Sequence, residues 1–241
     1  MTSVLVDFDL AEMLRCSLGL RQAMRSAPSM EAAARECCRY FHEELVTESG
    51  EPACALVRCY KTHRFHDLDR DLQAIARRAL DSNTAPASVL RCLTLIGTTG
   101  VEPEWNDRRS SSGHQAIPLP TMAVVEKAPM VAQLIRALGL DIATAINPSR
   151  DVVRDLAGKT YGVFHVPEAT GSPYIPAQDF VRRYGIRSVV GFGGVLPSGD
   201  LFAVILFCRV LVTPAAADRF RTLALDAKSC LLRYSPTQVF D

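Results

Sequence analysis

The side chains best suited to chemistry lie in a stretch of this sequence that has no regular hydrophobic period. From Gly97 to Pro120 the chain is rich in Gly, Pro, Ser and charged residues, and it contains the single tryptophan, Trp105, followed by Arg108 and His114. An indole, a guanidinium and an imidazole can form an aromatic wall, hold an anionic group and hydrogen-bond a ligand. Irregular loops on a rigid scaffold often carry binding groups. We therefore expect this loop to contact a ligand; the alternative is a surface loop anchored by one buried tryptophan, with its charges in water.

Three residues outside that loop complete the predicted ligand-binding site: His165, Tyr174 and Phe192. They lie in a short strand, in the loop that follows it and in the next long apolar run. The arginine and the imidazoles favour a ligand with a carboxylate or a similar acceptor, because bidentate guanidinium contacts suit that geometry. We expect the site to be a cavity of mixed polarity, on the order of a few hundred Å³. In an alternative reading His165 ligates haem iron, although a hydrogen-bonded core or edge histidine is the more common outcome.

No arrangement in the sequence supports catalysis or tight metal binding. It lacks a Gly-x-Ser-x-Gly motif and a convincing cysteine–histidine pair. None of its eight cysteines has Cys-x-x-Cys spacing, and most interrupt apolar patterns, so we expect reduced thiols that act as small core residues. His63 and His66 have His-x-x-His spacing but no carboxylate or cysteine pattern that would complete a metal site. We predict no catalytic residue and no metal ligand.

Composition narrows the class of partner. The 241 residues include 27 basic and 26 acidic side chains, for a net charge of +1. This balance argues against a nucleic acid as the main partner, because phosphate binding needs a basic excess on one face. No apolar run approaches the length of a membrane-spanning helix, and the first residues are acidic where a signal peptide would be basic. We expect a cytoplasmic protein with no membrane span.

Apolar residues at helical spacing predict helices, and continuous apolar runs predict strands. The predicted helices cover residues 10–24, 29–42, 71–80, 126–138, a segment that begins near 147–148, 176–184 and 213–234. The predicted strands cover residues 53–60, 90–96, 161–166, 188–196 and 201–208. A Pro-Ser-Gly-Asp loop at 197–200 joins the last two strands as a hairpin, and Thr213 and Pro214 begin the closing helix. Helices before, within and after a mostly antiparallel sheet give an α+β layer architecture.

This order of elements, with the hairpin from Ser188 to Arg209 and the strand and loop from Val163 to Tyr174, resembles the GAF fold. The resemblance covers roughly residues 29–209. It implies an antiparallel sheet with helices on its faces and flanking N- and C-terminal helices. The domain organisation would then be a flanking helix at 1–28, a GAF-like sensor domain at 29–212 and a C-terminal signalling and dimerisation helix with its tail at 213–241.

The resemblance also implies a function: a non-catalytic sensory domain that binds a small molecule or cofactor in a pocket on one face of the sheet. Such domains dimerise through flanking helices and pass the signal to an output domain or partner. The sequence identifies neither the ligand nor a required cofactor. Two alternatives stay open, a haem-based gas sensor and a thiol-dependent reductase built on the same fold. The reductase would need Cys54, Cys59 and Cys92 to meet across neighbouring strands.

The terminal helices carry apolar stripes that lie outside the domain defined by the strands. We expect a second copy of the chain to cover them, so that helices from residues 10–24 and 218–234 of two protomers form a four-helix bundle. The segments at 97–150 and 166–176 should then lie over the other face of the sheet. This arrangement places Trp105 and His165 on the same face.

Overall fold

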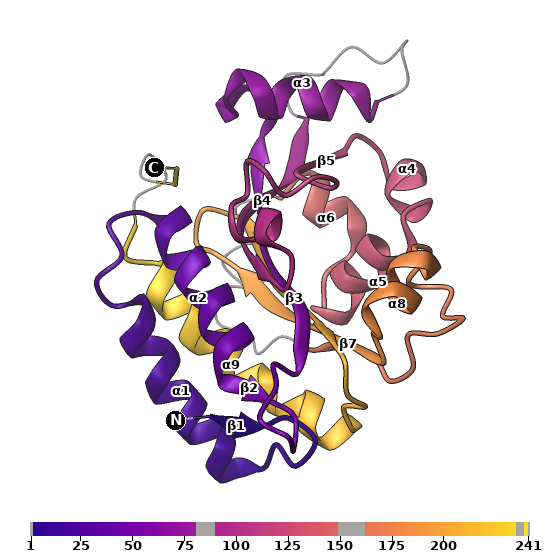
Figure 1. Cartoon of the computed structure of the whole chain (residues 1–241). Helices are drawn as coiled ribbons and strands as arrows, with labels where there is room; N and C mark the ends of the chain where they lie inside the picture. Colours follow the sequence, from indigo (N-terminus) through magenta and orange to yellow (C-terminus); the bar gives the residue numbers. More distant parts are fainter. Residues whose placement is uncertain (1, 81–89, 149–161, 235–238, 241) are drawn as a thin grey trace.

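The computed structural model describes residues 2–80, 90–148, 162–234 and 239–240, and Figure 1 shows a sheet with helices on both faces. The sheet has six antiparallel strands in the order β5-β4-β3-β8-β7-β6. Their bounds are β3 Cys54–Arg64, β4 Arg91–Gly100, β5 Ala116–Leu119, β6 Phe164–Val166, β7 Ser188–Val195 and β8 Leu201–Cys208. A separate parallel pair joins β1 (Ser3–Val4) to β2 (Leu45–Val46). The predicted α+β architecture is confirmed.

Two long helices, α2 (Met30–Glu44) and α9 (Pro214–Leu231), cover one face of the sheet, and a third, α1 (Leu10–Met24), packs against both of them. Each begins at a side chain that accepts a hydrogen bond from the third helical amide, which satisfies an amide that the helix itself cannot. These N-cap residues are Asp9, Ser29 and Thr213. Pro214 occupies the first position of α9, where its fixed φ suits a helix start.

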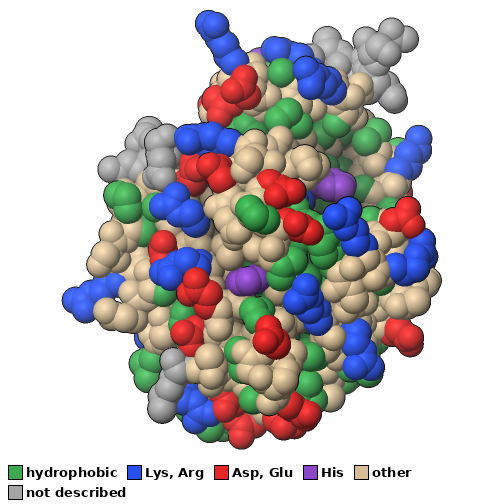
Figure 2. Space-filling model, in the orientation of Figure 1, with side chains coloured by type: hydrophobic (Ala, Val, Ile, Leu, Met, Phe, Trp, Pro, Cys, Tyr) green, Lys and Arg blue, Asp and Glu red, His purple; other side chains and the backbone are tan. Residues whose placement is uncertain are grey.

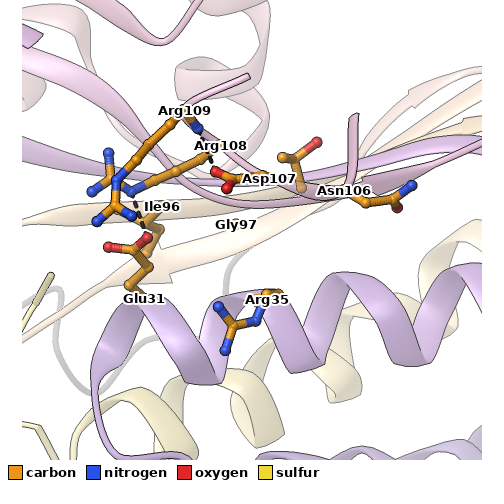
Figure 3. Close-up of a pocket in the computed structure, with 9 residues that line it drawn as sticks. Glu31, Arg35, Ile96, Gly97, Asn106, Asp107, Arg108 and Arg109 are labelled. Carbon is orange, nitrogen blue, oxygen red and sulfur yellow. Dashed lines mark hydrogen bonds and ion pairs between the residues drawn. The ribbon is translucent and has the colours of Figure 1, made fainter. Parts of the chain in front are cut away.

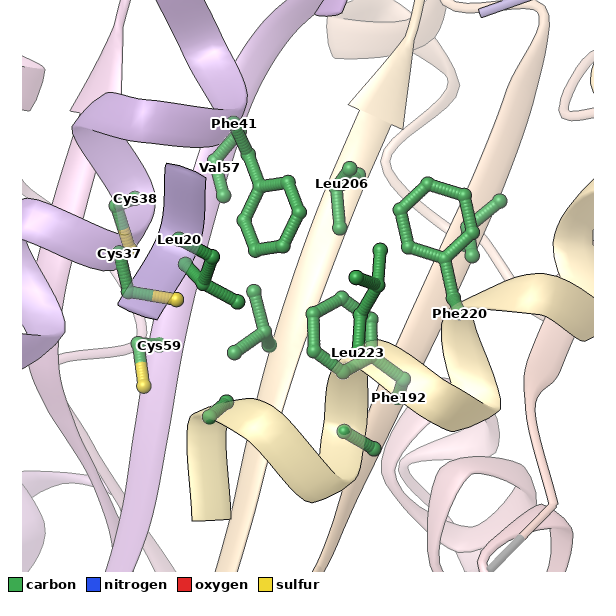
Figure 4. Close-up of a cluster of buried hydrophobic side chains, with 14 of the residues drawn as sticks. Leu20, Cys37, Cys38, Phe41, Val57, Cys59, Phe192, Leu206, Phe220 and Leu223 are labelled. Atoms are coloured by element: carbon green, nitrogen blue, oxygen red, sulfur yellow. The ribbon is translucent and has the colours of Figure 1, made fainter. Parts of the chain in front are cut away.

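The core beneath these helices is aromatic. Phe192 of β7 lies edge-on to Phe41 of α2, with ring centroids 5.5 Å apart, and 5.6 Å from Phe220 of α9 (Figure 4). All three side chains are fully buried. Burying a side chain of this size stabilises a fold by about 1.5–3 kcal/mol, so this cluster holds the helices to the sheet.

The apolar stripe of α9 is therefore covered within one chain, whereas the stripe of α1 is covered only in part, because Leu10, Leu14 and Leu18 stay exposed. Leu20 of α1 and Leu223 and Leu231 of α9 are all buried in the same cluster as the sheet residues. The expectation that a second protomer covers these stripes is wrong for α9, which packs on β7 and on α1. For the exposed leucines of α1 it stays a prediction.

Shorter helices cover the opposite face: α4 (Met122–Glu126), α5 (Pro129–Ala137), α6 (Ile142–Ile146) and α8 (Gln178–Tyr184). A third group, α3 (Arg70–Arg78) with the short η1 (Phe65–Asp67), packs at the end of β4 around Leu72 and Cys92. Acidic and basic side chains are mixed over the face in Figure 2, with hydrophobic side chains between them.

Two segments differ from their predictions. The stretch from 97 to 120 is more regular than expected: β4 continues to Gly100, η2 (Pro103–Asn106) follows, and β5 pairs with β4. The helix predicted at 126–138 corresponds to α5, which begins at Pro129, and a separate short helix, α4, precedes it. The helix expected from Asn147–Pro148, with its inward Val152, Val153 and Leu156, lies almost entirely outside the described residues.

Candidate functional site

A cavity of about 560 Å³ lies on the sheet face that α5 and α8 cover. Its floor is formed by alternate residues of β3 and β8, namely Leu56, Arg58, Tyr60, Ile205 and Phe207. The residues between them, such as Val57 and Leu206, face α1, α2 and α9 instead. Side chains of a strand alternate between faces. The same two strands therefore contribute residues to the cavity on one face and to the core beneath α2 and α9 on the other.

Aromatic rings form one wall of the cavity. Trp105 lies in η2, and its ring centroid is 6.0 Å from that of Phe180 in α8. Phe180 in turn lies edge-on to Phe207 of β8 at 5.2 Å. Edge-to-face pairs at such distances add about 0.5–1.5 kcal/mol beyond burial. The wall therefore fixes the segment after β4 against α8.

Arg58 is the buried cation of the cavity floor, with only 7% of its surface exposed. Its Nη1 donates to the Gly113 carbonyl at 3.1 Å and the Tyr60 hydroxyl at 3.3 Å. Its Nη2 donates to Ser111 Oγ at 2.9 Å and the Ser112 carbonyl at 3.3 Å. Within the described parts of the chain no carboxylate forms an ion pair with Arg58, and its Nε has no hydrogen-bond partner. Buried charges are normally paired, which makes this arginine unusual.

The remaining polar groups of the cavity are also cationic or neutral. His114 has φ of +59°, a left-handed conformation that is uncommon outside glycine. Partial burial, and then the charge of Arg58, lower the pKa of His114 below its ordinary value. Burial raises the pKa of Tyr60 although Arg58 opposes this. Lys127 is the C-cap residue of α4, and the described lining residues include no Asp or Glu.

A smaller hollow of about 90 Å³ lies on the other side of the segment after β4 (Figure 3). Arg108 Nε pairs there with Glu31 Oε1 of α2 at 2.7 Å. The guanidinium of Arg108 also lies 4.7 Å from the ring centroid of Phe240. Glu31 and Arg108 are thus already paired with each other, and the hollow is too small for more than water or a small ion.

The six predicted site residues do not converge on one cavity. Trp105 and His114 line the large cavity, whereas Arg108 lines the small one. His165 is on the opposite face: its neighbours Phe164 and Val166 point toward α5, so alternation turns the imidazole toward α9, where Nε2 lies 2.9 Å from the Val212 carbonyl.

The last two predicted residues lie elsewhere again. Phe192 belongs to the core on the other face of the sheet, because it lies two residues from Val190 in β7 and its side chain is on the same face. Tyr174 does not line the cavity and is 39% exposed. The expectation that Trp105 and His165 share a face is therefore wrong, and with it the placement of a haem on His165 in this cavity.

Sequence reasoning missed Arg58 and Tyr60. Both lie in an apolar strand, Ala-Cys-Ala-Leu-Val-Arg-Cys-Tyr, whose composition predicts a strand and does not by itself indicate a role for the arginine. The alternation of side chains along the strand is the signal that could have found it. Arg58 shares a face with Leu56 and Tyr60, and this pattern predicts a buried position for its side chain. A charged residue at such a position is seldom placed there by packing alone.

The cysteines do not form a reactive site. All eight are buried, and none lines either cavity. Cys54 and Cys208 face each other across β3 and β8 with their Sγ atoms 4.0 Å apart. Burial raises the pKa of Cys59 and of Cys92 to about 12. A thiol held neutral in this way is a poor nucleophile.

The residues that the structure describes contain neither a cluster of metal ligands nor a helix that could span a membrane. Over these residues, no three His, Cys, Asp or Glu side chains cluster as metal ligands would, and His63 is buried while His66 is exposed. Nor does any helix in the described ranges combine the length and apolar character needed to cross a bilayer.

The solved structures that share this architecture include GAF domains. The chain is similar to the GAF domain of a phosphoenolpyruvate-protein phosphotransferase from Coxiella burnetii, with 9% identity, a TM-score of 0.50 and coverage of 92% of this chain and 93% of that one. It also matches the corresponding Acinetobacter GAF domain at 12% identity, with TM-score 0.44 and coverage of 92% and 93%. A third match is the phytochrome photosensory core module of Stigmatella aurantiaca at 9% identity, with TM-score 0.43, covering 96% of this chain and 38% of that one.

No protein-family model and no curated protein matches the sequence. At such low identities the structural likeness establishes the fold alone. The chain is a GAF-like module.

Proposed function

We propose that this chain is a non-catalytic GAF-type sensory domain that binds a small molecule in the cavity between the sheet and helices α5 and α8. The cavity itself carries the proposal. Its volume of about 560 Å³ lies within the range of small-molecule sites, and its mostly apolar lining with a few polar groups is typical of them. The GAF-like fold supports the sensory role, because GAF domains are generally regulatory.

The cavity's chemistry supports binding over catalysis. Its described lining holds no cysteine and no carboxylate, so it lacks the groups that thiol chemistry and carboxylate acid–base chemistry need. The buried, neutral thiols weigh against the reductase alternative. The position of His165 weighs against the haem alternative.

The shared strands offer a route for the signal. Arg58 and Tyr60 floor the cavity, while Val57 and Cys59 of the same strand pack against the terminal helices. A shift of β3 on ligand binding would therefore repack the other face of the sheet, because close-packed interiors transmit small displacements. In this proposal α1 and α9 relay the change to an output domain or partner. Dimerisation through these helices and a cytoplasmic location remain predictions.

Native mass spectrometry of the purified full chain tests the proposal. We expect a bound small molecule, and we expect Val131→Phe to remove it, since Val131 lines the cavity and the larger ring would fill part of it. Val124→Phe on the exposed side of α4 is the matched control and should retain the ligand. Absence of any bound molecule, together with no stabilisation by a broad panel of metabolites, would count against a sensory binding site.

A further inference from the structure

The floor of the cavity shows an electrostatic imbalance. Arg58 is held by two carbonyls, a serine hydroxyl and a tyrosine hydroxyl, none of which carries a negative charge. Across the described residues, Arg58 Nε is a buried donor without an acceptor. Hydrogen bonds orient the guanidinium but leave its charge uncompensated in an apolar surrounding, and such a charge is costly to bury.

The rest of the lining adds to this imbalance. Lys127 is a second cation that lines the same cavity. His114 is neutral near pH 7, because its own burial and then the positive charge of Arg58 lower its pKa. The described part of the lining includes no acidic residue that could offset these groups. Opposite them are apolar and aromatic side chains, among them Leu134, Phe180 and Ile205.

We propose that the ligand of this cavity is an amphipathic monocarboxylate, whose anionic head pairs with Arg58 and whose apolar body lies against α5, α8 and the Trp105 wall. This inference rests on the proposed function and gives its ligand a chemical class. One guanidinium with four of its donors already engaged suits a single planar negative charge better than a phosphate, which needs more donors. The Tyr60 hydroxyl accepts from Arg58, so its own proton can be donated to the same carboxylate.

Trp105 provides the measurement, because it is the only tryptophan of the chain and lines the cavity. The probes are two acid and alcohol pairs below their aggregation limits: decanoate with decanol, and 4-phenylbutyrate with 4-phenylbutanol. Titration of the full chain should change Trp105 fluorescence, and at least one acid should bind about 10–100-fold more tightly than its alcohol. The two pairs distinguish an aliphatic body from an aromatic one.

Variants assign that preference to one residue. Arg58→Gln should lower the affinity for the acid to that of the alcohol and leave the alcohol unchanged. Arg58→Lys keeps the charge, loses the guanidinium N–H groups that bind the Ser111–Gly113 segment, and should retain part of the preference. Arg136→Gln is the control, since Arg136 is an exposed cation of α5 that pairs with Glu126 and does not line the cavity. If Arg58→Gln does not fold, the comparison of acid with alcohol in the wild-type chain and in Arg58→Lys decides.

Each result has a defined meaning. If in both pairs the alcohol binds as tightly as its acid, or if Arg58→Gln keeps the preference, the monocarboxylate is overturned while a ligand-binding cavity remains. If no probe binds but a molecule co-purifies, its identity decides: a carboxylate supports the inference, and a neutral or cationic compound refutes it. If no probe binds and nothing co-purifies, the proposed function falls together with the inference.

Discussion

Asp200, in the β7–β8 hairpin loop, is the anion between two nearly buried cations. It accepts from Lys61 Nζ at 2.8 Å and pairs with Arg91. Burial by itself raises the pKa of Asp200, but Lys61 and Arg91 outweigh it and hold that pKa below the ordinary value. Burial also lowers the pKa of Lys61, against the effect of Asp200. Through these two ion pairs, Asp200 joins the hairpin loop to β3 and β4.

Asp200→Asn should lower the free energy of unfolding by about 3–5 kcal/mol, because it leaves Lys61 and Arg91 buried without a counter-charge. Urea unfolding followed by circular dichroism measures the change. Asp218→Asn, which removes an exposed partner of Arg221 on α9, should cost no more than about 1 kcal/mol. Equal stabilities of the two variants would show that the hairpin contact contributes little.

His63 is a buried imidazole at the end of β3 that makes stability depend on pH. Burial, followed by the charge of Lys61, lowers the pKa of His63 to about 3. An unfolded histidine has a pKa near 6.5, so between these values the unfolded chain binds a proton that the folded chain does not. Stability is therefore lost as pH falls from about 6.5, by about 1.4 kcal/mol per pH unit.

His63→Phe should remove that part of the slope, which guanidinium unfolding at pH 7, 6, 5 and 4 will measure. His165, His42 and His114 also have lowered pKa values, so the informative quantity is the difference between variant and wild type. His66→Gln, two residues beyond the strand and exposed, is the control. A His63→Phe variant with the wild-type slope would contradict this assignment.

Residue type alone predicts only part of the candidate site. Trp105 and His114 were identified because unusual residues in an irregular segment stand out. His165 and Phe192 were misplaced because the phase of a strand relative to the covered face depends on its neighbours in the sheet. Arg58 was missed because it sits inside an apolar strand.

Among the elements, α1 carries two different hydrophobic surfaces. Met13 and Leu20 face the core, whereas Leu10, Leu14 and Leu18 are 60%, 54% and 69% exposed. An exposed row of leucines along a helix is a common feature of interaction surfaces. If the predicted homodimer forms, this row is the part of α1 available to it.

Leu14→Glu with Leu18→Glu should convert the predicted dimer to monomers that retain the wild-type far-ultraviolet spectrum, as light scattering and circular dichroism can show. Leu223→Glu should instead unfold the chain, since Leu223 is completely buried and a charge there has no partner. A wild-type chain that is monomeric at micromolar concentration would remove the dimer prediction.

Gly97 of β4 allows α2 to approach the sheet. A Cβ at this position would lie 2.6 Å from the Ala34 carbonyl group. Gly97→Ala should therefore cost about 1–3 kcal/mol in unfolding free energy, measured in urea. In Gly19→Ala the added methyl group meets the Tyr40 side chain rather than backbone, and that ring can move. A Gly97→Ala variant no less stable than Gly19→Ala would argue against tight packing of α2.

The elements themselves were largely predictable from sequence. The hairpin, the three long helices and their caps follow from local signals, namely apolar spacing, Ser29 and Thr213 at N-caps, and Pro214 after the cap. β5 was not found, because four residues with a proline give little local signal and the strand exists through its pairing with β4.

For the molecule as a whole, one sheet separates the large cavity from a helical core. Decanoate at 100 times its dissociation constant should raise the free energy of unfolding by about 2.7 kcal/mol. Hydrogen exchange should slow in β3, β8 and α9, while α3, which packs in a separate cluster, should be unaffected. The Arg58→Gln variant at the same decanoate concentration is the control. Protection confined to the cavity side would show that the sheet does not relay the change.

The packing of α1 on α9 also constrains the order of events during synthesis. Phe8, just before α1, stacks on Phe220 at 5.1 Å, and Arg21 pairs with Asp226 at 2.7 Å. The ribosome makes α1 before every other helix of the fold and α9 after all of them. The side of α1 that contacts α9 therefore has no α9 partner until nearly the whole domain has been translated. We therefore expect folding of this face to be completed only after α9 has been synthesised, and the nascent chain to expose this apolar surface until then.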